Sequence, residues 1–137
     1  MTDTRIHDSF ARQSLMETFG AEILSVADGA VEITAPIGPG VLQQHGFAHA
    51  GLTFSLGDSA AGYAALSLLG ADMEVVTSEM RIHLLAPARG ERLVARGRVV
   101  RFGRRLIVVA ADVFAVLDGE ETHVALLTGT MVPVPTG

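Results

Sequence analysis

Residues 50–69 read AGLTFSLGDSAAGYAALSLL, and this stretch decides how the chain folds. It holds no proline and many helix-forming residues, so it predicts a helix that closes at Gly70. Gly51, Gly57 and Gly62 stand in it among alanines and serines, although a glycine inside a helix costs about 1 kcal/mol relative to alanine. The small side chains therefore predict a buried helix that other backbone approaches closely.

Strand-forming segments lie on both sides of this helix. Before it, residues 5–19 predict one short amphipathic helix, and Asp28-Gly29 predicts a hairpin turn between two short strands. The predicted strands cover residues 22–26, 31–35, 75–85, 91–100, 106–117 and 122–132. Pro133 and Pro135 are expected to end the last strand. Many strands with one buried helix predict an α+β fold, a curved antiparallel sheet wrapped around residues 50–69.

Composition limits the class of protein. A chain of 137 residues with 49% hydrophobic residues suits one domain, residues 1–137, with a sizeable core. Because the net charge is −5 and tryptophan is absent, we expect no nucleic-acid partner. No stretch of about 18 residues is apolar throughout, the first 20 residues do not resemble a signal peptide, and cysteine is absent. These features predict a cytoplasmic protein without a membrane partner or a thiolate metal site.

Asp58 is the residue of this helix that most needs an explanation. A carboxylate among small apolar residues must reach solvent, pair with a buried group, or serve a site. Helix-borne acids often face water, so the residues alone leave both interpretations open. In a cleft, the same carboxylate could act as a general base or as a nucleophile.

Polar residues, Gln43, His45 and His49 among them, come just before the helix. Free backbone N–H groups at Ala50 and Gly51, aided by the helix dipole, could form an oxyanion hole for a substrate carbonyl. A single histidine here more often caps the helix or bonds to its loop. His45 and His49 also have a spacing that metal ligands can share, but no third ligand stands out, so no metal is expected.

The start of the predicted helix and Asp58 lie far apart along the helix axis. Ala50 and Asp58 are eight residues apart, which is about 12 Å along a helix axis. Both cannot contact one small carbonyl group within a single chain. If both act on one bond, the site combines the helix start of one subunit with Asp58 of another, which predicts a homodimer with symmetric sites at its interface.

The order of these residues resembles the PaaI-like branch of the hotdog-fold thioesterases. That branch has a His-Gly-Gly type of turn and an acid on the central helix seven residues after the second glycine. Here His49-Ala50-Gly51 is similar to the turn, with alanine in place of the first glycine, and Asp58 stands at the position of the acid. The segment from Thr77 to Gly90 and the hairpin at 102–104 are also similar, so the likeness spans roughly residues 20–134.

The resemblance implies a hotdog fold and an acyl-CoA thioesterase that acts on a small aryl or medium-chain acyl-CoA. It implies that Asp58 is the nucleophile or general base and that the Ala50 N–H, with Gly51 beside it, polarises the thioester carbonyl. The same comparison implies that His49 lies near the thioester, that Gln43 holds the carbonyl or the water, and that Thr77 positions water. It also implies dimers paired into homotetramers, CoA bound at the dimer interface, and no cofactor beyond the CoA of the substrate.

Further residues are candidates for substrate binding. Arg101, Arg104 and Arg105 cluster at a strand junction, where they could form a patch for the phosphates of CoA or a solvated charged edge. The loop around Phe47 is expected to form a pocket wall. Ser78, next to Thr77, could donate a hydrogen bond to a ligand or be an ordinary strand residue.

Two other functions use the same residues. A hotdog hydratase or dehydratase pairs an acid with a histidine across the site, which His49 and Asp58 would allow. A non-catalytic acyl-CoA-binding protein could use the same fold, although binding alone does not need a buried acid in a small-residue helix. Thiol release from an acyl-CoA separates hydrolysis from both alternatives.

Overall fold

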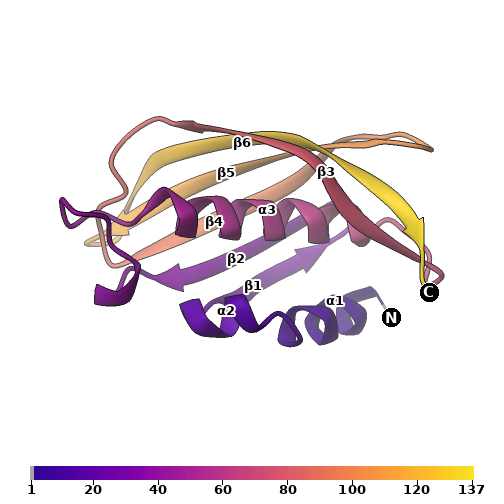
Figure 1. The fold of residues 1–137 in the computed structure, drawn as a ribbon, viewed down its shortest axis with the longest axis horizontal. Helices are drawn as coiled ribbons and strands as arrows, with labels where there is room; N and C mark the ends of the chain where they lie inside the picture. The colour runs from indigo at the N-terminus through magenta and orange to yellow at the C-terminus, as the bar shows by residue number, and fades with distance from the viewer. Residues whose placement is uncertain (1) are drawn as a thin grey trace.

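The computed structural model describes residues 2–137 and contains one six-stranded antiparallel sheet around one long helix (Figure 1). The sheet has the strand order β1-β2-β4-β5-β6-β3. The elements are α1 (Thr2–Ala11), α2 (Ser14–Phe19), β1 (Glu22–Ala27), β2 (Ala30–Pro36), the 3-10 turn η1 (Pro39–Val41), α3 (Ala50–Leu66), β3 (Met73–Leu84), β4 (Arg92–Phe102), β5 (Ile107–Leu117) and β6 (Glu120–Pro135). The predicted α+β architecture is confirmed, and α3 ends at Leu66, a few residues earlier than expected.

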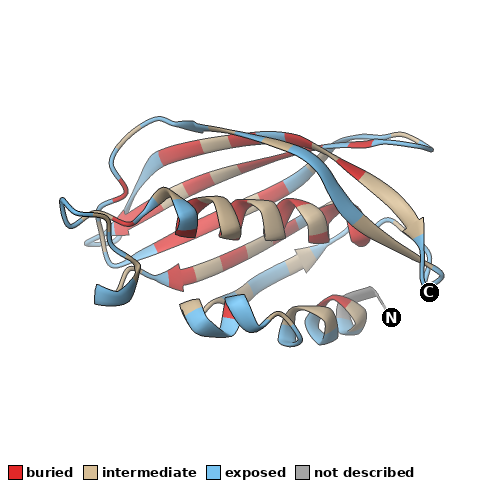
Figure 2. Cartoon of the chain, viewed as in Figure 1, coloured by how far each residue is buried: buried red, intermediate tan, exposed pale blue. Residues whose placement is uncertain are grey.

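Helix α3 lies against the concave face of the sheet, and the buried residues of both elements face each other (Figure 2). The closest approach is at Gly97 of β4, where an added Cβ atom would lie 2.3 Å from the backbone carbon of Ala60. Only glycine in the strand and a small residue in the helix allow this approach. The prediction of a buried helix closely approached by backbone is therefore confirmed.

The N-terminal segment forms two helices, so the prediction of one helix over residues 5–19 is wrong. The helices are interrupted between Ala11 and Ser14, and the second ends at Gly20, which is in the left-handed conformation with φ of 68°. Arg5 attaches this segment to the connection between α3 and β3, because its guanidinium donates to the Leu69 and Gly70 carbonyls at 3.3 and 2.9 Å. At the interruption Gln13 donates to the Tyr63 hydroxyl at 2.8 Å, a tertiary contact that local periodicity does not encode.

Both predicted Asp-Gly hairpins are present, with positive φ at Gly29, Asp118 and Gly119. The expectation that prolines end the last strand is wrong, because β6 continues to Pro135. Strand β5 pairs with β6 only as far as Met131, so beyond that residue β6 pairs with β3 alone. A proline without an N–H is tolerated where one side of a strand has no partner.

Strand β3 forms one edge of the sheet. It pairs with β6 on one side, and its other side has no strand neighbour among residues 2–137. Large apolar side chains are exposed along and just after it: Val76 is 51%, Leu84 61% and Leu85 52% exposed. A long exposed edge of this kind is a template for pairing with another strand.

Candidate active site

Asp58 lies in the middle of α3, and its carboxylate meets β3. The Thr77 hydroxyl donates a hydrogen bond of 2.8 Å to Asp58 Oδ1. The pairing of β3 with β6 shifts register between Thr77 and Glu79, which leaves Ser78 as the extra residue of a β-bulge. A bulge re-aims the neighbouring side chains of a strand. The structure thus brings together two residues that the sequence proposed, while Ser78 is exposed on the bulge itself.

The surroundings of Asp58 disfavour its charged form. Burial raises the pKa of the Asp58 carboxyl above its ordinary value, and the hydrogen bond from Thr77 lowers this pKa in part. Raised carboxyl pKa values are typical of acids that exchange protons with a substrate or water. Asp58 is half-buried, so its second oxygen remains accessible to a ligand.

A cavity of about 230 Å³ opens beside Asp58. Its walls come from α3, from β3 and β6, and from the N-terminal helices; the lining includes Gln13, Asp58, Gly62, Tyr63, Thr77 and Met131. Sequence reasoning did not propose Gln13 or Tyr63 for the site. No sequence signal indicates them, because Gln13 reaches Tyr63 across 50 residues of chain, where its amide donates to the Tyr63 hydroxyl at 2.8 Å.

The start of α3 carries the second group of candidate residues. His49 is the N-cap, and its Nδ1 accepts a hydrogen bond of 2.7 Å from the Gly51 N–H. The Gly51 N–H is thus engaged within the chain, whereas the Ala50 N–H has no acceptor among residues 2–137. Because Nδ1 is the acceptor, the neutral His49 ring carries its proton on Nε2 and can donate it outward.

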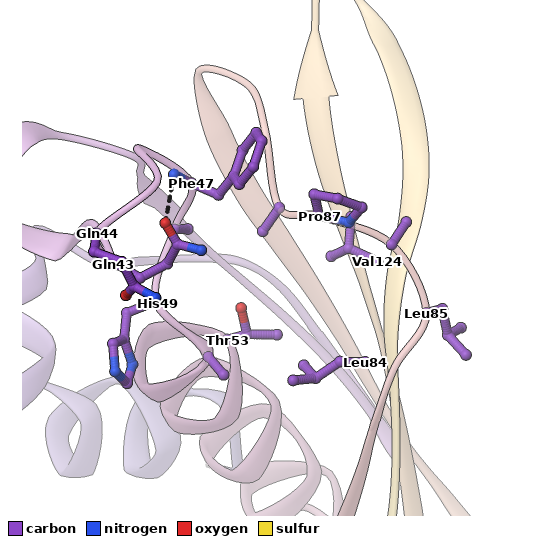
Figure 3. A pocket seen from close by; sticks show the side chains of 13 residues that line it. Gln43, Gln44, Phe47, His49, Thr53, Leu84, Leu85, Pro87 and Val124 are labelled. Carbon is purple, nitrogen blue, oxygen red and sulfur yellow. Dashed lines mark hydrogen bonds between the residues drawn. The ribbon is translucent and has the colours of Figure 1, made fainter.

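Gln43 is held by its own loop. Its side-chain carbonyl accepts hydrogen bonds from the His45 and Phe47 N–H groups at 2.6 and 3.2 Å. In Figure 3 the dashed line joins this oxygen to the Phe47 nitrogen, and the amide nitrogen lies on the opposite side of the Gln43 side chain. The amide of Gln43 is therefore oriented as a donor, which suits a carbonyl or water as its acceptor.

A larger cavity, of about 630 Å³, opens next to these residues (Figure 3). Its polar lining includes Gln43 and His49, and its apolar lining includes Phe47, Leu84, Leu85 and Val124. Leu84, at the end of β3, is exposed and borders this cavity. An exposed apolar wall with a few polar groups is the usual composition of a small-molecule site.

Ala50 and Asp58 border different cavities of the same chain. Ala50 lines the larger cavity and Asp58 lines the smaller one. This arrangement agrees with the separation of about 12 Å expected from their spacing on a helix. Neither cavity of one chain holds both an oxyanion donor and the carboxylate.

The arginines divide into two groups. Arg96 bonds to Glu121 and Glu32 and stacks over Phe114, and Arg98 pairs with Asp112. Arg101, Arg104 and Arg105 are exposed around the β4–β5 hairpin, and none of them lines either of the two cavities described above. They remain candidates for contacts with charged groups outside those cavities.

The described residues contain neither a candidate metal site nor a membrane-spanning helix. Within residues 2–137 no group of three or more histidine, cysteine, aspartate or glutamate side chains could hold a metal ion. Across the same residues no helix has the length and apolar character needed to cross a membrane.

Comparison with known proteins decides the family. Residues 45–121, which include the start of α3 and Asp58, match the thioesterase superfamily. The chain belongs to the thioesterase superfamily. A Deinococcus radiodurans relative of this thioesterase is 37% identical over 120 residues, which cover 86% of this chain and 77% of that relative.

Solved structures agree with this assignment. A thioesterase family protein from Silicibacter pomeroyi is 42% identical, with a TM-score of 0.97 over 99% of this chain and 100% of that chain. The PaaI protein of the phenylacetic acid degradation operon of E. coli is 25% identical, with a TM-score of 0.86 over 97% of this chain and 93% of that chain. The predicted PaaI-like hotdog fold is confirmed, and this thioesterase is a hydrolase of acyl thioesters.

Proposed function

We propose that this thioesterase hydrolyses acyl-CoA to the free acid and CoA, with Asp58 as the catalytic acid-base or nucleophilic group. The observation that carries this proposal is the Asp58 carboxylate, which is half-buried, bonded to Thr77 at 2.8 Å and next to a cavity. As general base, Asp58 takes a proton from water as the water oxygen attacks the thioester carbon. The tetrahedral intermediate then expels the CoA thiolate, which receives a proton as the C–S bond breaks.

A nucleophilic role for Asp58 uses the same geometry. The carboxylate attacks the thioester carbon, CoA leaves, and water then hydrolyses the mixed anhydride. In both routes the Ala50 N–H donates to the carbonyl oxygen, which becomes negative in the tetrahedral intermediate. Gln43 and His49 lie beside this donor and would hold the carbonyl or the attacking water, and Thr77 would fix the carboxylate. The proposal needs no metal or cofactor.

We further propose that the working unit is a homodimer formed through β3. Thr77, which holds Asp58, lies in the first half of β3, and Leu84, at its end, borders the cavity that contains Ala50. When a strand pairs antiparallel with its own copy around a two-fold axis, the beginning of one strand lies beside the end of the other. This pairing would bring Asp58 of one chain toward Ala50 of the other and would cover the exposed apolar side chains of β3.

CoA would enter along the groove between the two subunits. The exposed Arg101, Arg104 and Arg105 are available for its phosphates, since guanidinium groups bind phosphate in a bidentate way. Two such dimers would form the homotetramer. The larger, mostly apolar cavity with Phe47 suits the pantetheine arm of CoA.

The proposal is tested with a panel of acyl-CoAs that runs from acetyl to hexadecanoyl and includes aryl-acetyl thioesters, together with 2-enoyl-CoA and 3-hydroxyacyl-CoA as substrates for a hydratase or dehydratase. Release of free thiol is measured with a thiol reagent, and the α,β-double bond is followed in the same samples by absorbance. We expect thiol release from at least one acyl-CoA without a change in the double bond. A change in the double bond without thiol release would instead indicate a hydratase, and binding without either reaction would indicate an acyl-CoA-binding protein.

A further inference from the structure

The two glycines in the middle of α3 have different surroundings. At Gly57 an added Cβ atom would lie 2.8 Å from the buried side chain of Leu127, so close packing explains the glycine. At Gly62 an added Cβ atom would lie 3.6 Å from the Met131 side chain, which is ordinary contact. Gly62 is within regular helix, where alanine is more stable. Neither packing nor backbone conformation explains the glycine at position 62.

Gly62 borders the cavity that contains Asp58. The two residues are four apart, so they lie on the same face of α3, one turn from each other. Gln13, Val75 and Met131 line the same cavity as Gly62, and the Met131 side chain is the nearest to the missing Cβ position. The missing side chain therefore leaves open the part of the cavity that leads away from the carboxylate.

The wall opposite the sheet is fixed by hydrogen bonds within the chain. The Tyr63 hydroxyl bonds to Ser9 at 3.0 Å and accepts from the Gln13 amide at 2.8 Å. The Ser59 hydroxyl donates to the side-chain carbonyl oxygen of Gln13 at 3.5 Å. These hydrogen bonds connect the N-terminal segment to α3 beside the cavity.

The cavity extends along α3 from Asp58 to Leu66. Over these eight residues the helix advances about 12 Å, and Gly62 lies in the middle of this span. Glu74 of β3 also lines the cavity and lies 4.0 Å from Arg5, which bonds to the carbonyls after α3.

We propose that this cavity binds the acyl group of the thioester, and that the absence of a side chain at Gly62 sets how long an acyl group is accepted. This inference rests on the proposed function, because it places the thioester carbonyl next to Asp58. Acyl groups of short to medium length fill the space between Asp58 and Leu66, while long saturated chains exceed it. Gly62 determines specificity and takes no part in the chemical step.

The test compares Gly62→Ala and Gly62→Leu with the wild type on acetyl-CoA and hexanoyl-CoA. Alanine adds a methyl group that the fold accommodates, so we expect its melting temperature to rise by about 3–5 °C. For Gly62→Ala, kcat/KM should fall about tenfold on hexanoyl-CoA and stay within about twofold of the wild type on acetyl-CoA. For Gly62→Leu the loss on hexanoyl-CoA should reach about a hundredfold, with acetyl-CoA still hydrolysed.

Gly40→Ala is the matched control, since an added Cβ atom there has no neighbour within 4 Å and the residue lies outside the cavity. Its ratio of hexanoyl-CoA to acetyl-CoA turnover should equal that of the wild type. Equal losses on both substrates in a folded Gly62→Ala protein would overturn the acyl subsite, even if Asp58 catalyses hydrolysis as proposed.

Binding provides a readout that does not depend on hydrolysis. The thioethers S-ethyl-CoA and S-hexyl-CoA are titrated by calorimetry into the wild type and Gly62→Leu. Loss of affinity for the hexyl compound alone supports the subsite, and equal affinities of both proteins for it overturn the subsite. Wild-type protein that binds the thioethers but releases no thiol from any acyl-CoA would refute the proposed function separately.

Discussion

The two cavities along α3 differ in what they offer a thioester. At the start of the helix the chain presents donors, the Ala50 N–H and the Gln43 amide, beside an exposed apolar wall. At the middle of the helix it presents an acceptor, the Asp58 carboxylate, in a smaller cavity closed by the N-terminal helices. Hydrolysis of a thioester needs a hydrogen-bond donor for the carbonyl oxygen. It also needs either a nucleophile that attacks the carbonyl carbon or a base that activates the attacking water. In the proposed mechanism each cavity therefore supplies half of a hydrolytic site.

Removal of the carboxylate is expected to have the largest effect. Asp58→Asn keeps the shape of the side chain and removes the base or nucleophile, so kcat/KM for acyl-CoA hydrolysis should fall about 10²–10⁴-fold. Thiol release under single-turnover conditions measures the loss. Hydrolysis at the wild-type rate in Asp58→Asn would assign the chemistry to another residue and leave the smaller cavity without its role.

Ala50→Pro tests the donor half without disturbing the helix. Proline lacks the N–H, and it fits the first position of a helix after His49, whose φ of −64° and ψ of 142° suit a residue before proline. We expect kcat/KM to fall about 10²–10³-fold at an unchanged melting temperature.

Ala50→Gly is the control for this variant, because it retains the N–H. It should keep hydrolysing acyl-CoA at a rate near that of the wild type. If the proline variant matched the glycine variant in kcat/KM, the Ala50 N–H would not be the oxyanion donor.

Thr77→Val removes the hydrogen bond that lowers the pKa of Asp58 and leaves burial, which raises it. In the wild type we expect the acid limb of the pH profile of kcat/KM to lie above the pKa of an ordinary aspartate. In Thr77→Val this limb should move further toward neutral pH. At the plateau we expect a loss of about tenfold, because the carboxylate is less well held. Thr77→Ser is the control, since it keeps the hydroxyl and should keep the acid limb in place.

The smallest expected effect is on the pH dependence of the free energy of unfolding, which should reflect the raised pKa of Asp58. In the pH window from the pKa of Asp58 in the unfolded chain to its raised value in the fold, the folded state binds more protons. The free energy of unfolding therefore decreases as pH rises through this window and stays lower above it. Asp58→Asn lacks this contribution, so its thermal unfolding should be less dependent on pH there. Parallel curves for both proteins would show that burial does not perturb Asp58.

Much of this fold and site could be predicted from local sequence. Asp-Gly pairs predict the hairpins, small residues predict the buried helix, and the spacing of Ala50 and Asp58 predicts that they border different cavities. The hydrogen bond between Thr77 and Asp58 joins two residues that were proposed separately.

The parts that could not be predicted depend on contacts between distant segments. Gln13 and Tyr63 meet because the N-terminal helices pack on the fold, with Ile6 and Met16 buried in the core. The continuation of β6 through Pro133 depends on where β5 ends. The helix cap that His49 forms with the Gly51 N–H is one of the alternatives that the sequence left open.

The central claim is that each active site combines the helix start of one chain with Asp58 of another. Asp58→Asn and Ala50→Pro chains are unfolded together in equal amounts, refolded, and assayed for thiol release beside each variant refolded alone. If sites are shared between chains, random pairing yields about a quarter of intact sites, and the mixture should recover about a quarter of wild-type activity. A mixture no more active than the separate variants would contradict the shared site.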